Sequence, residues 1–132
     1  GYGYLPLMTM KHCPMSLVKN CKDDLSCESC KFSQGYGLKD RKGVNFCMER
    51  KNKVTRIYNS LPLMVLDSLH KIYDAGIRFI RIDFTFEEEI EEIQDIYYSF
   101  AKGLVSKEEV DLVLDKYREK GITKGHYYRG II

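Results

Sequence analysis

The residues best suited to chemistry in this chain of 132 residues are five cysteines, all between positions 13 and 47. Their spacing is C-x7-C-x5-C-x2-C-x16-C, formed by Cys13, Cys21, Cys27, Cys30 and Cys47. Two thiols three positions apart, such as Cys27 and Cys30, can bind one metal ion or cluster. An odd number of cysteines near one end favours a metal or cluster site over a disulfide framework or scattered structural thiols.

The half of the sequence that carries the cysteines is also the basic half. Residues 1–60 contain eleven Lys and Arg against five Asp and Glu, a balance of +6. Residues 61–132 contain ten against fourteen, a balance of −4. A basic surface suits a polyanion such as RNA, or the anionic sulfide of a cluster with its thiolates, and it equally suits an ordinary solvated surface.

Neither a membrane span nor a secretion signal is visible in the sequence. No apolar run is long enough to cross a bilayer, and no signal-peptide pattern opens the chain. We therefore expect a cytoplasmic protein with no membrane partner. Because the chain begins with Gly1 rather than Met, we expect one domain excised from a longer protein, with a processed chain as the alternative.

Residues 1–60 are expected to form a small β-rich unit around the cysteines. The expected strands cover residues 5–10, 38–41, 44–49 and 54–58. The strand at 5–10 is expected to be buried, and residues 11–37 form a loop that carries four of the cysteines. Tight turns are expected at Lys42-Gly43 and at Asn52.

Residues 61–132 show a different pattern, in which strands alternate with helices. The expected elements are strands at 61–66 and 77–84, helices at 67–75 and 85–102, a helix from Ser106 to a stop at Gly121, and a tail at 122–132. The expected N-terminal caps are Asp67, the capping box of Thr85 with Glu88, and the capping box of Ser106 with Glu109. A βαβα run predicts parallel strands with helices on one side, so the fold class is α/β. It fits the closing part of a TIM-like barrel.

Arg81 and Asp83 are expected near the C-terminal end of the strand at 77–84. Alternate residues of a strand face the same way, so the two side chains share one face. In α/β barrels that end of the strands carries the chemistry. The alternative is an internal ion pair that orients the neighbouring loop.

Seven motifs occur in an order that resembles a known family. They are Tyr2-Gly3-Tyr4-Leu5-Pro6-Leu7-Met8, His12-Cys13-Pro14, Cys27-x-x-Cys30, Leu38-Lys39-Asp40-Arg41-Lys42-Gly43-x-x-Phe46, Ile57-Tyr58-Asn59-Ser60-Leu61-Pro62-Leu63, Arg81-Ile82-Asp83-Phe84-Thr85 and Gly125-His126-Tyr127-Tyr128-Arg129-Gly130. Together they resemble the C-terminal part of the catalytic region of the collagenase-like peptidases, family U-32. The resemblance covers nearly the whole chain and rests on the order and spacing of the motifs.

The resemblance implies a segment of a longer, bacterial-type cytoplasmic enzyme, and the rest of that enzyme is then its partner. A barrel-like α/β core precedes such a segment in the family. Some members are described as proteases that degrade collagen, which implies a peptide substrate. Others support oxygen-independent hydroxylation of transfer or ribosomal RNA bases, or of quinone precursors, and hold a four-iron, four-sulfur cluster on four cysteines.

The resemblance also implies the cluster ligands. Cys13, Cys27 and Cys30 match the family's pattern, and Cys47 is the expected fourth ligand with Cys21 as the alternative. Relatives often place a cysteine just before the Ile-x-Asn-Ser stretch, where this sequence has Val54. The alternative to a cluster is a structural zinc ion bound by the same thiolates. It would stabilise a module that has no activity of its own.

The three histidines do not supply a hydrolytic site, so no catalytic residue is assigned. His12 precedes Cys13, but adjacent residues of an extended chain point in opposite directions. His70 is expected on a helix as a surface or packed residue. The HExxH motif of zinc proteases is absent from the sequence.

A few charged residues are candidates for contact with a substrate or with RNA. They are Arg41 in the basic turn at 39–42, Arg81, Asp83, and His126 and Arg129 in the C-terminal tail. Aromatic and cationic side chains together can stack on bases and bind phosphate. The alternatives are a charged hairpin tip and a tail packed onto the sheet by Tyr127 and Tyr128.

Overall fold

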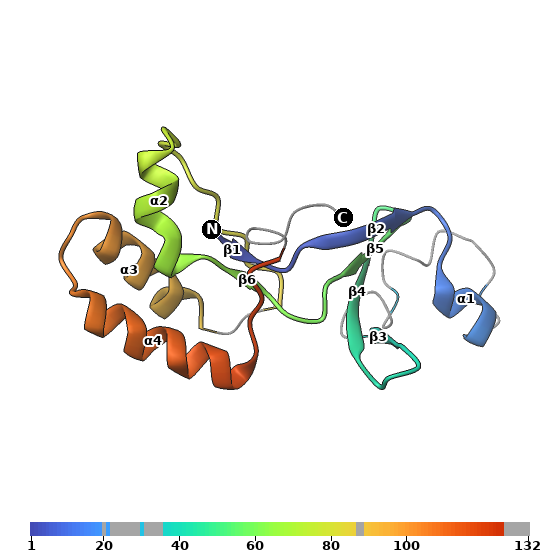
Figure 1. Ribbon diagram of the computed structural model, residues 1–132. Coiled ribbons are helices and arrows are strands. Elements are labelled where there is room, and N and C mark those ends of the chain that lie inside the picture. The colour runs from blue at the N-terminus through green and yellow to red at the C-terminus, as the bar shows by residue number, and fades with distance from the viewer. Residues whose placement is uncertain (20, 22–29, 31–35, 87–88, 126–132) are drawn as a thin grey trace. The chain divides into compact units, whose positions relative to one another are not determined.

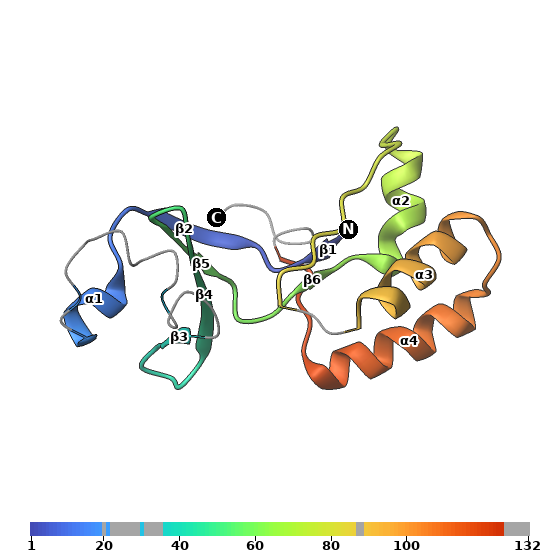
Figure 2. The same cartoon turned by 180° about the vertical axis from the view of Figure 1, so that it is seen from behind.

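The computed structural model describes residues 1–19, 21, 30, 36–86 and 89–125, and the chain divides into two compact units. The helical unit comprises Gly1–Tyr4 and Leu61–Ile132, and the cysteine unit comprises Leu5–Ser60. Helices and strands occur together, as Figure 1 and the reverse view in Figure 2 show, so the predicted α/β class is confirmed. The first four residues belong to the helical unit rather than to the unit that follows them in sequence.

A sheet in the order β2-β5-β4-β3 forms the centre of the cysteine unit, and each neighbouring pair is antiparallel. The strands are β2 (Pro6–Met10), β3 (Tyr36–Lys39), β4 (Asn45–Lys51) and β5 (Val54–Tyr58). The predicted strand at 54–58 is confirmed with its bounds. The other three are confirmed with their ends moved by one or two residues, because hydrogen-bonded pairing rather than composition decides where a strand stops.

Two turns fix the register of this sheet, and both were predicted. Asn52 and Lys53 adopt φ values of 52° and 59° between β4 and β5, the left-handed conformation that a two-residue type I′ turn requires. Between β3 and β4, Asp40 Oδ1 accepts hydrogen bonds from the backbone N–H of Lys42 at 2.8 Å and of Val44 at 2.9 Å. The second turn therefore depends on a carboxylate as well as on backbone conformation.

The expectation that the first strand is buried is wrong. β2 lies at the edge of the sheet, where β5 is its neighbour, and the side chains of Leu7 and Met8 are exposed. An apolar run indicates a buried strand only when other elements cover both of its faces. The sequence of β2 does not reveal that this covering is lacking.

Four segments from distant parts of the sequence lie side by side in the helical unit. Its two short strands are β1 (Tyr2–Gly3) and β6 (Leu63–Met64), which pair antiparallel. Tyr2 also bridges Ile82 in parallel, and Leu63 bridges Thr123 in parallel. β1 therefore lies between β6 and the segment around Ile82, and those two run in opposite directions. The predicted arrangement of neighbouring parallel strands is wrong here, because the first residues of the chain lie between them.

The predicted strand at 77–84 is mostly not a strand. Within it only Ile82 forms a β-bridge, and Asp83 N–H donates to the carbonyl of Tyr2 at 3.0 Å. A strand needs a neighbour to bond its backbone, and β1 offers only two residues. The apolar side chains of Ile77, Phe79 and Ile80 are exposed as a result, Phe79 by 92%.

The helical segments of this unit begin with a 3₁₀ turn, and three α-helices follow. They are η2 (Leu66–Ser68), α2 (Leu69–Asp74), α3 (Ile90–Ala101) and α4 (Lys107–Lys120). The capping box of α4 is confirmed: Glu109 N–H donates to Ser106 Oγ at 3.2 Å, and Ser106 N–H donates to Glu109 Oε2 at 2.7 Å. Gly121, with a φ of 96°, ends that helix as predicted.

The predicted cap at Asp67 is wrong, whereas the predicted capping box of Thr85 with Glu88 stays a prediction because Glu88 lies outside the described residues. Asp67 lies inside η2, and its carboxylate accepts hydrogen bonds from Ser68 Oγ and from Lys124 Nζ rather than from the backbone of a helix. α3 begins five residues after Thr85, with Glu89 at its N-cap position and no side-chain cap. Phe86 packs edge-on against Tyr4 at 5.4 Å between ring centroids, a tertiary contact that the capping rule does not consider.

A hydrophobic core fills the space between the helices and the short strands of the helical unit. Its eleven buried residues are Tyr2, Met64, Val65, Leu66, Leu69, Ile72, Ile93, Tyr97, Val110, Leu114 and Tyr117. The hydroxyl of Tyr97 donates to the carbonyl of Gly1 at 2.6 Å and accepts from Val65 N–H at 3.2 Å. This buried hydrogen bonding joins the start of the chain to the helical core.

Candidate functional site

Cys47 lies in the middle of β4, paired with Gly37 of β3. Its side chain is half-buried, and burial raises the pKa of its thiol. A metal binds the thiolate rather than the thiol, so a metal at Cys47 would displace a proton. The position is therefore compatible with a metal ligand whose loading becomes more favourable as pH rises.

A short helix separates Cys13 from Cys21. α1 (Pro14–Lys19) begins with a proline, whose fixed φ suits a first helical position. The carbonyl of Cys13 accepts hydrogen bonds from Ser16 N–H at 3.0 Å and from Ser16 Oγ at 2.7 Å. Cys21 N–H donates to the carbonyl of Ser16 at 3.2 Å, so Ser16 is bonded to both cysteine backbones. A loop was expected here, and the proline signal for a helix was missed.

A buried arginine connects β4 to the segment that carries Cys13. Nη1 of Arg50 donates to the carbonyl of Lys11 at 2.9 Å and to Thr55 Oγ1 at 2.9 Å. Arg50 and Thr55 are both buried. Arg50 therefore holds the chain two residues before Cys13 against the strand that contains Cys47. The sequence analysis did not select Arg50, because a lone arginine in a strand gives no sign of an inward orientation.

The thiol donors suit zinc or an iron–sulfur cluster, but the described cysteines do not assemble a site by themselves. Cys13, Cys21, Cys30 and Cys47 are free thiols. Within the described part of the chain, no three His, Cys, Asp or Glu side chains form a group that could hold a metal ion. Cys27, one of the four expected ligands, lies outside the described residues. The expected ligand set thus remains a prediction that depends on Cys27.

Arg81 and Asp83 do face the same way, and they bind each other. Arg81 Nε and Nη2 each lie 2.7 Å from Asp83 Oδ1. The pair is exposed rather than internal, with 83% of the Arg81 side chain and 47% of the Asp83 side chain accessible. Gly3 lies directly against Asp83, because a Cβ at Gly3 would come within 2.6 Å of the Asp83 carbonyl oxygen. An exposed ion pair of this kind contributes little to stability, so both side chains remain accessible to a ligand.

The remaining predicted contact residues divide between the hairpin and the tail. Arg41 is exposed at the turn between β3 and β4, as expected for a hairpin tip. His126 and Arg129 lie outside the described residues. Lys124, just before them, makes an ion pair with Asp67, which also lies within 4.0 Å of Arg118. This pairing joins Lys124 to η2 and α4 within the helical unit.

Asp67 has a depressed pKa because of those partners. Its partial burial alone would raise the pKa, but hydrogen bonds from Lys124 and Ser68, with the charges of Lys124 and Arg118, lower it overall. The carboxylate therefore stays ionised until strongly acidic pH. The ionic link between η2 and the start of the tail is present over the same pH range.

No hydrolytic pair involves the described histidines. His12 and His70 are exposed, and in the described part of the chain neither forms a hydrogen bond with a Ser or Cys side chain. The third histidine, His126, lies outside the described residues, so the expectation that the histidines supply no nucleophile–base pair stays a prediction.

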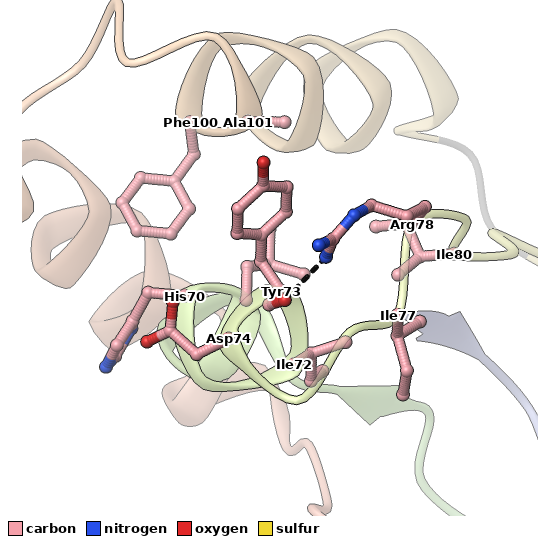
Figure 3. Close-up of a pocket in the computed structure, with 10 residues that line it drawn as sticks. His70, Ile72, Tyr73, Asp74, Ile77, Arg78, Ile80, Phe100 and Ala101 are labelled. Carbon is pink, nitrogen blue, oxygen red and sulfur yellow. Dashed lines mark hydrogen bonds between the residues drawn. The ribbon is translucent and has the colours of Figure 1, made fainter.

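The sequence analysis missed a hollow of about 310 Å³ between α2, the segment that follows it and the end of α3. Its walls are mainly apolar, and Arg78, Asp74 and His70 lie among them. Figure 3 shows Tyr73 in the middle of the group, with Arg78 on one side of its ring and Asp74 and His70 on the other. The lining residues are Leu69, His70, Ile72, Tyr73, Asp74, Ile77, Arg78, Ile80, Phe100 and Ala101. Sequence offers no signal for such a hollow, because its residues come from three separate segments.

Comparisons with known proteins assign no relative. A scan against protein-family models, a search of curated proteins and a search of solved structures each found no match. Among the described helices, none is both long enough and apolar enough to cross a membrane.

Proposed function

We propose that this chain is a metal-binding segment of a larger enzyme, equivalent to the C-terminal part of the catalytic region of a collagenase-like peptidase of family U-32. Its cysteines hold an iron–sulfur cluster. The seven ordered motifs support the family assignment. The helical unit is the closing part of a TIM-like barrel, and the exposure of Phe79 supports this proposal because the remaining strands of a barrel would cover that side chain.

One observation carries the metal-binding proposal: all five cysteines fall in the unit with the smaller core. In the described part of that unit, the buried apolar residues are Met48, Ile57 and Tyr58, against eleven in the helical unit. A unit of this size with so little buried apolar surface gains most from a cross-link by metal. A metal bound by these thiols would supply that cross-link.

The proposed ligands are Cys13, Cys27 and Cys30, with Cys47 as the fourth and Cys21 as its alternative. A cluster bound there supplies one-electron chemistry. The chain's own contribution is to position the thiols: Ser16 fixes the backbone of Cys13, and Arg50 ties the same segment to β4. The raised pKa of Cys47 means that loading releases a proton and improves with pH.

The test is anaerobic purification of the chain, followed by assay of iron, acid-labile sulfide and zinc. We expect iron and sulfide in equal amounts and a broad visible absorption band. Cys27→Ser and Cys30→Ser are expected to abolish both. Comparing Cys47→Ser with Cys21→Ser identifies the fourth ligand, because only one of the two should lose the cluster.

Three outcomes separate the alternatives. Stoichiometric zinc without iron, with unfolding of the cysteine unit on chelation, would establish the structural zinc module instead. A colourless, metal-free protein that cleaves gelatin would establish proteolysis without a cluster. Full iron and sulfide content in Cys27→Ser would contradict the proposed ligand set.

A specific observation favours RNA as the substrate over a peptide. At the β3–β4 turn, Asp40 is bonded to the backbone, and in the described residues no carboxylate pairs with Lys39, Arg41 or Lys42. Three unpaired cations at one hairpin tip suit phosphate. The RNA-hydroxylating branch of the family is therefore the second candidate for the whole enzyme.

Binding of single-stranded RNA at several salt concentrations tests this candidate. Replacing Lys39, Arg41 and Lys42 by Gln should lower the slope of log affinity against log salt by about 2, at about 0.7 per phosphate contact. The control replaces Lys102 and Lys107 of the helical unit by Gln, which should leave the slope unchanged. Equal slopes in all three proteins would exclude the hairpin as an RNA contact.

A further inference from the structure

Arg78 supplies a fixed positive charge at the hollow beside α2. Its guanidinium carbon lies 4.3 Å from the centroid of the Tyr73 ring, a cation–π distance. Its Nη1 donates to the Tyr73 backbone carbonyl at 2.7 Å, the dashed line in Figure 3. Two contacts with one residue hold the guanidinium in place before any ligand arrives.

Among the described residues, no side chain neutralises the charge of Arg78. In the described part of the chain no carboxylate forms an ion pair with it, although Asp74 lines the same hollow. Figure 3 places Asp74 and His70 on the far side of the Tyr73 ring from the guanidinium. A guanidinium has five N–H donors, and the bond to Tyr73 uses one of them. The others remain for an anion.

Next to this charge the walls of the hollow are apolar. Ile72, Ile77, Ile80, Phe100 and Ala101 line the hollow together with the Tyr73 ring. The hollow is open to solvent on one side, because Tyr73, Ile77 and Ile80 are themselves exposed. The volume of about 310 Å³ is at the small end of the range of roughly 300–1,000 Å³ for ligand pockets. The side of the hollow next to Arg78 is apolar, with Asp74 and His70 across the Tyr73 ring, so it is complementary to an apolar body whose one anionic group lies at Arg78.

We propose that this hollow is a binding site for a small carboxylate with an apolar body, such as a medium-chain acid. The carboxylate takes two parallel hydrogen bonds from Arg78, the geometry that a guanidinium favours. The apolar body of the ligand lies between the rings of Tyr73 and Phe100 on one side and the side chains of Ile77 and Ile80 on the other. The site belongs to the helical unit alone and is independent of the cysteines.

The experiment titrates the 132-residue chain with octanoate and with octanamide, and follows amide chemical shifts by NMR. Octanoate should shift the amides of Tyr73, Arg78 and Ala101 in a saturable way. It should bind about tenfold more tightly than octanamide, because the amide has the same body without the charge. That ratio corresponds to about 1.4 kcal/mol.

Variants separate the charge from the cavity. Arg78→Gln should bring the ratio of the two affinities to about one, and Arg78→Lys should keep an intermediate ratio, since a lysine retains the charge without the planar donors. Ala101→Phe fills the hollow and should abolish binding of both ligands. Lys102→Gln is the matched control: Lys102 lies 5.7 Å from the Tyr98 ring outside the hollow, and its removal should change nothing.

Several results would overturn the proposal. Equal affinities of the unmodified chain for octanoate and octanamide would show that Arg78 does not bind the carboxylate. Undiminished binding by Ala101→Phe would place the ligand elsewhere. Shifts of the same amides when protein concentration alone is raised would make a second copy of the chain the occupant.

Discussion

The two units of this chain use different means to hold their structure. The helical unit buries eleven apolar residues and surrounds them with ion pairs such as Lys116 with Glu92. In the described part of the cysteine unit, three apolar side chains are buried along with Arg50 and Thr55, and turns determine much of the register. Apolar packing contributes most in the first unit, whereas in the described part of the second unit hydrogen bonds within turns and between strands contribute a larger share.

This difference is the reason for proposing a metal site in the cysteine unit rather than in the helical unit. A unit with a sufficient core tolerates the loss of a surface hydrogen bond, because apolar burial supplies most of its stability. A unit with a small core depends on each turn and each cross-link. Amide hydrogen exchange read residue by residue distinguishes the two behaviours, since it reports the stability of each unit separately.

The largest expected effect is in the helical core. Leu114 of α4 is fully buried, so Leu114→Ala should destabilise the helical unit by roughly 3 kcal/mol through lost burial and a residual cavity. Leu112 lies on the same helix with 72% of its surface exposed, and Leu112→Ala should cost less than about 0.5 kcal/mol. The change in the free energy of unfolding for each variant is measured by denaturant titration, with amide hydrogen exchange as the residue-specific observable.

The same experiment tests whether the units are independent. With Leu114→Ala, amides of β4 and β5 should keep their protection while those of α3 and α4 lose it. An equal loss of protection in the strands β4 and β5 and in the helices α3 and α4 would show that the two units unfold together as one cooperative unit.

Asp40 tests the dependence of the cysteine unit on its turns. Asp40→Ala removes the acceptor of two backbone N–H groups and should cost about 1.5 kcal/mol. Asp40→Asn keeps a side-chain oxygen and should cost less than half as much. Thermal unfolding observed in the amides of β3 and β4 gives the values, and an unchanged midpoint in Asp40→Ala would show that the turn forms without the carboxylate.

Ser106 provides the matching test in the helical unit. Ser106→Ala removes the N-cap of α4 and should cost about 1 kcal/mol, whereas Ser106→Asp retains an acceptor and should cost little. Because the core of this unit is large, the loss should be confined to the first turn of α4. Loss of protection throughout α4 would mean that its N-terminal cap, rather than its packing, holds the helix.

Asp67 gives the smallest effect, and it depends on pH. Its folded-state pKa lies below the ordinary value of 3.8, so the stabilisation is complete above that value and is lost as pH falls through the folded-state pKa. Asp67→Asn should therefore cost less than about 1 kcal/mol at neutral pH, since the partners are partly exposed. Unfolding curves of the two proteins should converge at strongly acidic pH. A constant difference down to that pH would show that ionisation of Asp67 contributes nothing.

Local signals in the sequence predicted the elements whose determinants are local. The turns at Asn52 and Lys42-Gly43, and the capping box of Ser106 with Glu109, all formed as expected. The signals failed where a distant residue competed: Asp67 binds Lys124 instead of capping a helix. A rule that considers four or five neighbouring residues cannot include a partner 57 positions away.

The candidate sites divide in the same way. The cysteines, their spacing and their restriction to one part of the chain are visible in the sequence, as is the alternation that puts Arg81 and Asp83 on one face. Arg50 and the hollow beside α2 are not visible there. Arg50 needed the fold to show that it is buried, and the hollow exists only because three segments meet.

The sequence by itself determined the strands of the cysteine unit, the helix from Ser106 to Gly121, the main turns and the chemistry of the thiol donors, because these depend on residue type and short spacing. Only the tertiary structure decided that β1 lies between β6 and the segment around Ile82, and that this segment is left largely without a strand partner. It also decided that Arg78 has no carboxylate partner among the described residues. The physical reason is that strand pairing, burial and charge neutralisation each bring together residues that are far apart in the chain. Which residue pairs with which therefore depends on the whole fold rather than on neighbouring positions.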